Sequence, residues 1–96
     1  MNETWIFKDG LSQQGCTSFP YAFRLMYNAV KTGVEKGRKF NDMVKQMAII
    51  APTKDQHGDP RRYNYQEAAQ MAEIQGFFVN GQIDSRKFKV DRLMKH

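Results

Sequence analysis

The sequence has few of the residues that build disulfide bonds and metal sites. It contains one cysteine, Cys16, and two histidines, His57 and His96. One cysteine cannot form an internal disulfide bond, and these three residues show no paired ligand spacing such as Cys-x-x-Cys or His-x-x-x-His. We therefore expect no disulfide bond, no bound metal and no cofactor.

Cys16 has two interpretations. A single cysteine is most often a free thiol that packs as a small apolar side chain. It also lies just before a predicted helix, where the helix dipole can lower the pKa of a thiol and make it reactive or available to a partner. We expect the first role, and the second stays open.

Long apolar runs are missing too. The longest, residues 47–51, has five residues, whereas a membrane-spanning helix needs about 20. Residues 1–6 also lack the basic start and the apolar core of a secretory signal. We therefore expect a cytoplasmic protein with no membrane partner.

Motifs of catalysis are absent as well. The sequence has no nucleophile elbow, no phosphate-binding glycine loop and no dinucleotide fingerprint. The one candidate acid–base group is His57, which precedes Asp59 and Arg61 and could act on a phosphodiester in a minimal nuclease. Because a solitary histidine in a polar loop is usually not catalytic, we expect no catalytic residue and a protein that is not an enzyme.

Basic residues, in contrast, are in excess, and the formal net charge is +5. Residues 31–62 hold eight basic residues against four acidic ones, and residues 84–96 hold five against two. Residues 63–83, between these blocks, contain two acidic residues and no basic one. Two basic blocks of this kind favour an anionic partner such as a nucleic acid.

The apolar pattern predicts a mainly α protein. The 96 residues, 41% of them hydrophobic, suit one small domain over residues 1–96. We expect three to four short helices in a compact bundle, with a short N-terminal strand and a small β-hairpin near residues 77–84.

The first predicted helix has the clearest pattern. Ser18 can cap its N-terminus, and Pro20 falls in the first turn, where the missing amide proton does no harm. Its apolar residues recur every three or four positions, as the core-facing side of a helix requires. They are Phe19, Phe23, Met26, Val30 and Val34.

Two further helices are predicted downstream. Asn41 can cap a second helix, in which the apolar residues between positions 43 and 51 share one face until Pro52 ends it. Asn64, with Glu67 three residues later, has the spacing of a capping box at the start of a third helix.

Little β structure is expected outside the hairpin. Residues 4–7 include aromatic and β-branched side chains and precede an Asp-Gly pair, so they are typical of a short strand that ends in a turn. Residues 10–18 and 52–64 are polar and contain glycine or proline. Both segments are predicted to be surface loops.

The segment after the third helix allows two structures. Asn80 and Gly81 suit a type I′ turn, which would close the hairpin. Alternatively the helix continues to Val79, and Gly81 ends it. Beyond residue 84, a last helix and a strand are both compatible with the pattern.

A nucleic-acid site is the first functional hypothesis. The run Arg61-Arg62-Tyr63-Asn64-Tyr65 combines cationic and aromatic side chains before a helix, so the arginines could hold phosphates while Tyr63 or Tyr65 stacks on a base. A second basic cluster could join it on one face and hold phosphates through its first three members; the cluster comprises Arg86, Lys87, Lys89, Arg92 and Lys95. The sequence thus suggests a small accessory protein, of a type common in bacteria and phages, that binds DNA or RNA.

The same residues have a simpler structural explanation. The tyrosines can pack on the core beside the third helix, and basic side chains often form the solvated side of an element. The sequence leaves both explanations open.

Protein binding is the alternative function. One group of residues supplies more apolar bulk than one side of a short element can bury; it comprises Trp5, Phe77, Phe78 and Val79. An exposed patch of these side chains could bind a protein or a second copy of the chain. Such a protein would be an adaptor or an inhibitor. In the other interpretation, Phe77 and Phe78 close the core.

Overall fold

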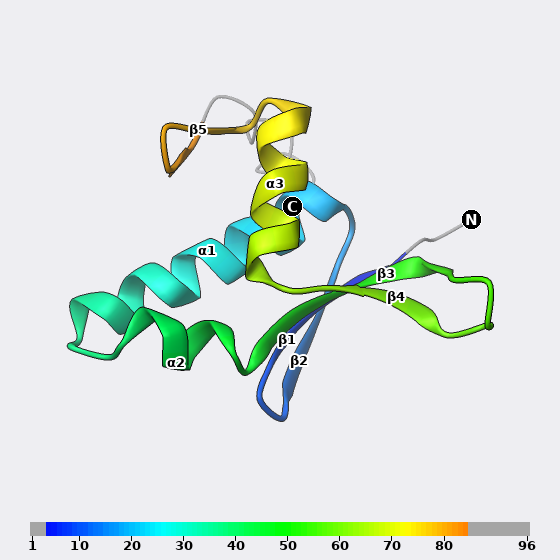
Figure 1. Cartoon of the computed structure of the whole chain (residues 1–96), viewed down its shortest axis with the longest axis horizontal. Coiled ribbons are helices and arrows are strands. Elements are labelled where there is room, and N and C mark those ends of the chain that lie inside the picture. Colours follow the sequence, from blue (N-terminus) through cyan, green and yellow to red (C-terminus); the bar gives the residue numbers. More distant parts are fainter. Residues whose placement is uncertain (1–3, 85–96) are drawn as a thin grey trace.

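A computed structural model describes residues 4–84 (Figure 1). Along the chain the elements are β1 (Trp5–Asp9), β2 (Ser12–Cys16), α1 (Phe19–Glu35), α2 (Phe40–Val44), β3 (Met47–Lys54), β4 (Pro60–Tyr63), α3 (Tyr65–Gln75), β5 (Phe78–Val79) and β6 (Gln82–Ile83). No helix within residues 4–84 is long and apolar enough to cross a membrane.

The prediction of a mainly α bundle is wrong, because the fold is α+β. A four-stranded antiparallel sheet has the order β2-β1-β3-β4, and β5 and β6 form a separate two-stranded hairpin. Within residues 4–84, three helices accompany the sheet. Any helix or strand beyond residue 84 lies outside the described residues.

The predicted second helix accounts for most of this error. Only residues 40–44 are helical, as the five-residue α2, and residues 47–54 form the central strand β3. Met47, Ile49 and Ala51 are buried while Ala48 and Ile50 between them are half-buried, which is the two-residue period of a strand. A short apolar run is compatible with the period of a helix and with that of a strand. Hydrogen-bonded pairing with β1 stabilises the strand in this protein.

Both predicted loops also contain strands. Residues 12–16 form β2, which pairs with β1 along its whole length through a tight turn at Gly10. Four of its five residues are exposed, so this edge strand shows no apolar alternation in the sequence. In the second segment, β3 continues past Pro52 to Lys54, and Pro60 begins β4.

Other predictions are confirmed. Ser18 caps α1 by accepting a hydrogen bond from the backbone amide of Tyr21. Asn64 and Glu67 form the capping box of α3, each side chain accepting from the other residue's amide at 2.8 and 3.0 Å. β1 is the N-terminal strand.

The hairpin near residues 77–84 is also confirmed. Gly76 ends α3 in the left-handed conformation, with φ of 88°. Asn80 and Gly81 then both have positive φ, at 54° and 75°, as a type I′ turn requires. The chain therefore reverses between β5 and β6 instead of extending the helix.

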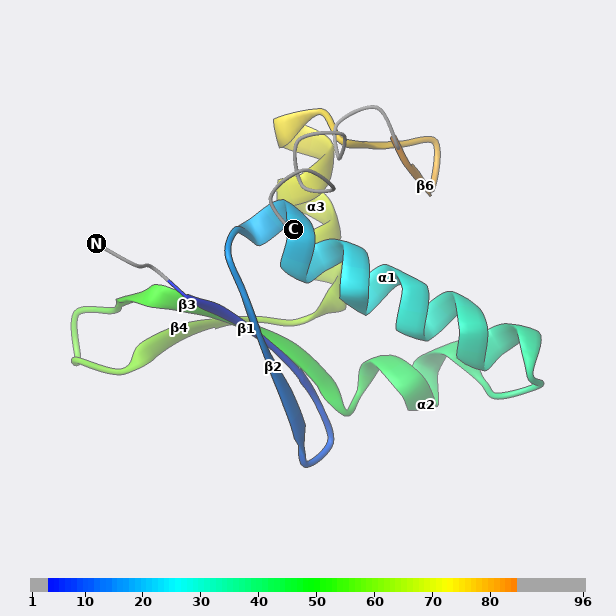
Figure 2. The same cartoon turned by 180° about the vertical axis from the view of Figure 1, so that it is seen from behind.

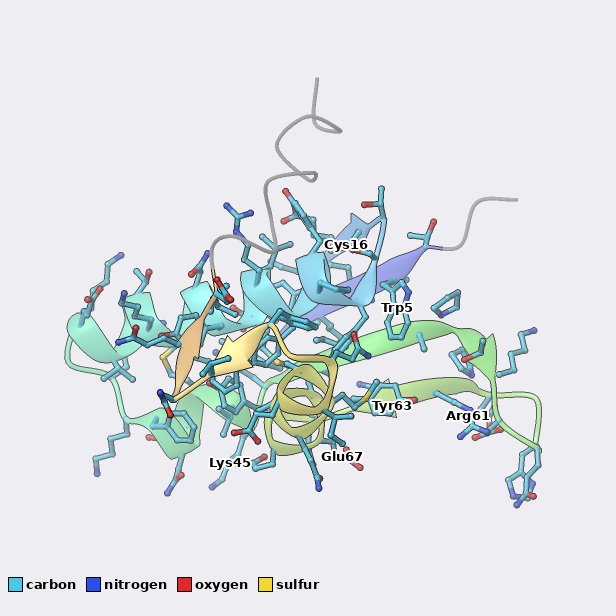
Figure 3. The ribbon with its side chains drawn as sticks, turned by 90° about the horizontal axis from the view of Figure 1, so that it is seen from above. Trp5, Cys16, Lys45, Arg61, Tyr63 and Glu67 are labelled. Atoms are coloured by element: carbon cyan, nitrogen blue, oxygen red, sulfur yellow. The ribbon has the colours of Figure 1, made fainter. Side chains whose placement is uncertain are left out.

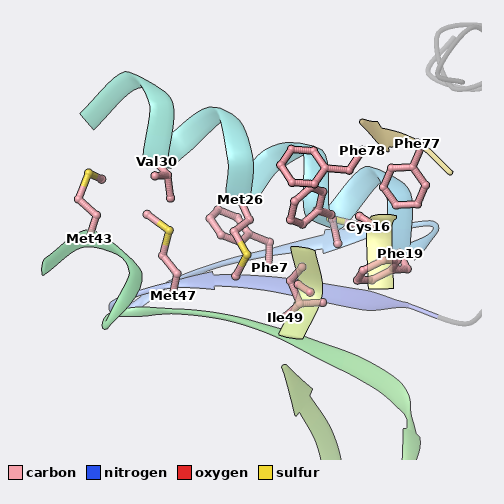
Figure 4. Packing of buried hydrophobic residues seen from close by; sticks show 14 residues of the cluster. Phe7, Cys16, Phe19, Met26, Val30, Met43, Met47, Ile49, Phe77 and Phe78 are labelled. Carbon is pink, nitrogen blue, oxygen red and sulfur yellow. The ribbon is translucent and has the colours of Figure 1, made fainter. Parts of the chain in front are cut away.

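The helices cover one face of the four-stranded sheet. Figure 4 shows α1 lying across the sheet, with Phe7, Met47 and Ile49 pointing up from the strands toward it. Ala68 and Ala72 of α3 belong to the same buried cluster. Figure 2 shows the molecule from behind. In this view the β3–β4 hairpin lies on one side of β1 and β2, and α2 lies on the other side.

Phe23 lies at the centre of the core. Its side chain is fully buried, and its ring centroid is 5.0 to 6.4 Å from five other rings. These rings belong to Phe19, Tyr27, Tyr65, Phe77 and Phe78. One side chain of α1 thus contacts both the start of α3 and the segment that follows α3.

Replacing Phe23 should destabilise the fold strongly. We expect Phe23→Ala to lower the free energy of unfolding by about 3–5 kcal/mol, because it removes a buried ring and leaves a cavity. Phe23→Leu should cost less and stay folded for measurement. Urea titration followed by circular dichroism measures both changes.

Ile74→Ala is the matched control, since Ile74 is also a large apolar side chain but is 79% exposed. Its effect should stay within about 0.5 kcal/mol. Equal losses for Phe23→Leu and Ile74→Ala would contradict a core centred on Phe23.

Candidate nucleic-acid interface

The arginine pair lies on the edge strand β4. Arg61 and Arg62 are both exposed, and Arg62 pairs with Ile50 of β3 while Tyr63 pairs with Ile49. Residues paired across antiparallel strands point to the same side of a sheet. Because Ile49 is fully buried under the helices, Tyr63 points toward the core and Arg62 points away from it.

The two tyrosines of the run pack on the core. Tyr63 is half-buried against the hydrophobic cluster. The ring of Tyr65 lies 6.0 Å from that of Phe23 and 5.4 Å from that of Phe40. Burial raises the pKa of the Tyr65 hydroxyl above its ordinary value. A base could stack on these rings only where they left their contacts with the core.

The face of the sheet opposite the helices, here called the open face, brings together residues from all four strands. One row across it runs from Gly15 of β2 through Ile6 and Ile50 to Arg62 of β4. The neighbouring row contains Gln13, Lys8 and Ala48. Half-buried apolar side chains thus lie at the centre of this face, between Lys8 and Arg62.

The acidic residue of the sheet lies on the other side. Asp9 is the one acid within β1 to β4, and it alternates with Lys8 in β1. It lines a hollow beneath α1 together with Thr32 and Lys36. The outward positions of the four strands therefore carry cationic, apolar and uncharged polar side chains.

Lys8 is the residue of this face that the sequence reasoning missed. A strand over residues 4–7 was predicted, and extending its alternation by one residue would have placed Lys8 beside Ile6. What the sequence could not supply was the pairing of β1 with both β2 and β3, which makes it an inner strand.

The β3–β4 hairpin extends beyond the rest of the sheet. Pairing between β1 and β3 ends at Ile50, and from there β3 continues with β4 alone. We call residues 53–61 the arm; all of them are exposed except the half-buried Asp55. Figure 1 shows the arm at the far right, away from the helices.

The tip of the arm is held by Asp55. Its carboxylate oxygen Oδ1 accepts hydrogen bonds from the backbone amides of His57 and Asp59, at 2.9 and 3.0 Å. The amide of Asp55 in turn donates to the carbonyl of Asp59 at 2.8 Å, and Gly58 takes the positive φ of 87° that the turn needs. The predicted loop is therefore a closed turn in which His57 is exposed.

The first basic block is divided between two places. One part lies near the end of α1 and around α2, and it consists of Lys36, Arg38, Lys39 and Lys45. The other part lies in the β3–β4 hairpin and consists of Lys54, Arg61 and Arg62. Figure 3 shows Lys45 and Arg61 far apart along the molecule. The second basic cluster, which comprises Arg86, Lys87, Lys89, Arg92 and Lys95, lies outside the described residues.

The apolar residues proposed for protein binding are mostly inside. Phe77 and Phe78 are 4% and 8% exposed, and their rings contact Phe23. Trp5 is half-buried, with its ring 5.3 Å from that of Phe19. Val79 alone of the four is exposed. The two phenylalanines therefore contribute to the core, and protein binding stays a prediction that the fold does not test.

Cys16 is a buried free thiol at the end of β2. Its burial raises the pKa of the thiol above the ordinary value, which opposes formation of the reactive thiolate. Within residues 4–84, no group of three or more His, Cys, Asp or Glu side chains could hold a metal ion.

Comparison with known proteins gives no relative. No protein-family model matches the chain, and no curated protein or solved structure matches it either. The function must therefore be argued from the arrangement of the residues themselves.

The burial of Cys16 leads to a test of its reactivity. A raised pKa means less thiolate than an exposed cysteine has at the same pH, and burial limits access of a reagent, so we expect the folded protein to react with an aromatic disulfide reagent at pH 8 more slowly than the urea-unfolded chain. The reaction is followed by absorbance. Equal rates would show that Cys16 is accessible and reactive in the folded protein.

Proposed function

We propose that the protein binds the phosphate backbone of a nucleic acid on the open face of its sheet, without catalysing a reaction. The observation that carries this proposal is the separation of charge between the two faces. Lys8 and Arg62 point outward, and Asp9, the one acid of these strands, points beneath α1. An anion that approaches the open face therefore meets cations without a neighbouring carboxylate in the strands.

The spacing of the cations supports a linear anion. Lys8 of β1 lies opposite Ala48 and Arg62 of β4 lies opposite Ile50, so the two cations flank β3 and are offset by two residues along it. With about 4.8 Å between neighbouring strands and about 3.3 Å per residue, the backbone positions of the two cations are about 12 Å apart. One strand of a duplex presents a phosphate about every 3.4 Å along the helix axis. The separation of the two cations thus matches a few successive phosphates.

The apolar centre of the face adds to the electrostatic attraction. Ile6 and Ile50 are half-buried and lie between Lys8 and Arg62. When a ligand covers them, water leaves the neighbourhood of the two cations, and charge–charge attraction is stronger where the effective dielectric constant is lower. Sugar carbons and base edges can contact the two isoleucines at the same time.

Removing one cation from the open face should weaken binding and its dependence on salt. For Lys8→Gln and for Arg62→Gln, we expect the slope of log affinity against log salt to become shallower by about 0.7–0.9. The measurement is fluorescence anisotropy with labelled DNA and RNA, each titrated at about 50 to 200 mM salt.

Lys31→Gln is the matched control, because it removes the same charge from an exposed position on α1, in the layer that covers the other face. It should leave the slope almost unchanged. If all three variants lost the same slope, binding would reflect net charge rather than the open face. If the unchanged protein bound none of the probes at low salt, the proposal would be abandoned.

A further inference from the structure

We infer that the nucleic acid is duplex DNA and that the arm, residues 53–61, enters its major groove. This inference rests on the proposed function and names its ligand. In this arrangement the open face holds phosphates and positions the protein, while the arm contacts base edges.

The end of the β3–β4 hairpin that carries the arm has dimensions that fit the groove. From Ile50 to Lys54, β3 continues for four residues with β4 as its one partner strand, a length of about 13 Å. The major groove of B-DNA is about 12 Å wide and 8.5 Å deep and admits a two-stranded β-ribbon. The irregular register between Ile50 and Lys54 adds local twist, which helps a ribbon to follow a curved groove.

The arm is also organised before binding. The Asp55 carboxylate ties the amides of His57 and Asp59, so the tip does not have to be ordered by the ligand. Because the Asp55 carboxylate already accepts these two hydrogen bonds, it is partly neutralised by the amide dipoles before DNA approaches. Exposed donors remain on the arm at Gln56 and Arg61, and these are the side-chain types that pair with adenine and guanine edges in the major groove.

The remaining acid of the arm, Asp59, is compatible with this role. Lys54 and Arg61 balance Asp55 and Asp59, so the arm itself has no net charge at pH 7. An arm of this kind contributes little general attraction, and an aspartate can accept a hydrogen bond from the amino group of cytosine. Attraction and base reading therefore belong to different parts of the surface.

A single strand suits this surface less well. Proteins that bind single strands stack the bases on exposed aromatic side chains. The aromatic residues of β1 to β4 are Trp5, Phe7 and Tyr63, and all three lie on the helix-covered side. Duplex RNA is disfavoured for another reason, because its major groove is too deep and narrow for side chains to read.

The test compares four labelled probes of one sequence by anisotropy. They are a DNA duplex, its single strand, the corresponding RNA duplex, and a DNA duplex in which 7-deazaguanine replaces guanine. The last probe removes the N7 acceptor from the major groove and leaves the backbone unchanged. We expect the unmodified DNA duplex to bind most tightly, and the 7-deazaguanine duplex to bind about 5- to 150-fold more weakly.

Arg61→Gln separates reading from attraction. It should lose the preference for guanine over 7-deazaguanine, whereas Lys8→Gln should keep this preference and bind both duplexes more weakly. Arg61 is exposed and Lys8 is half-buried on the open face, so circular dichroism should show both variants folded.

Equal affinity for the two duplexes, or tighter binding of the single strand or of RNA, would overturn the major-groove inference and leave backbone binding in place. Absence of binding to every probe would overturn both proposals.

Discussion

The packing around Phe23 is the constraint on which the rest of the structure depends. The ring belongs to α1, and it contacts Tyr65 at the start of α3 and Phe77 and Phe78 beyond its end. Because all of these segments converge on one buried side chain, the helices must lie on the same side of the four-stranded sheet. The opposite side of β1 to β4 then receives no helix from the described part of the chain.

This one-sided cover determines where charges of the strands can lie. A charged side chain is costly to bury without a partner, so Lys8 and Arg62 occupy positions that alternate with buried Phe7 and half-buried Tyr63. The same alternation sends the aromatic rings inward. The open face is therefore cationic because of how the core is filled, and the proposed role in binding uses a surface that the fold produces for its own stability.

The sequence predicted the features that depend on local chemistry. The caps at Ser18 and Asn64 and the turn at Asn80 follow from hydrogen bonds and backbone angles within a few residues. The strands β2 and β3 could not be predicted in this way. β2 is a polar edge strand, and the apolar run of β3 is compatible with a helix and with a strand. Both become strands because they pair with β1, which lies far from β3 in the sequence. For the candidate site, Arg62 was predicted from the local run Arg61-Arg62-Tyr63, whereas Lys8 required knowledge of which strands are neighbours.

The edge strand β4 has a further consequence for how the chain behaves among copies of itself. An exposed strand edge can pair with another molecule and start aggregation. Pro60 has no amide proton to donate, and Arg61 and Arg62 follow it directly. Two copies docking through this edge would bring four guanidinium groups together. The arginines proposed to contact DNA therefore also disfavour growth of the sheet at its β4 end.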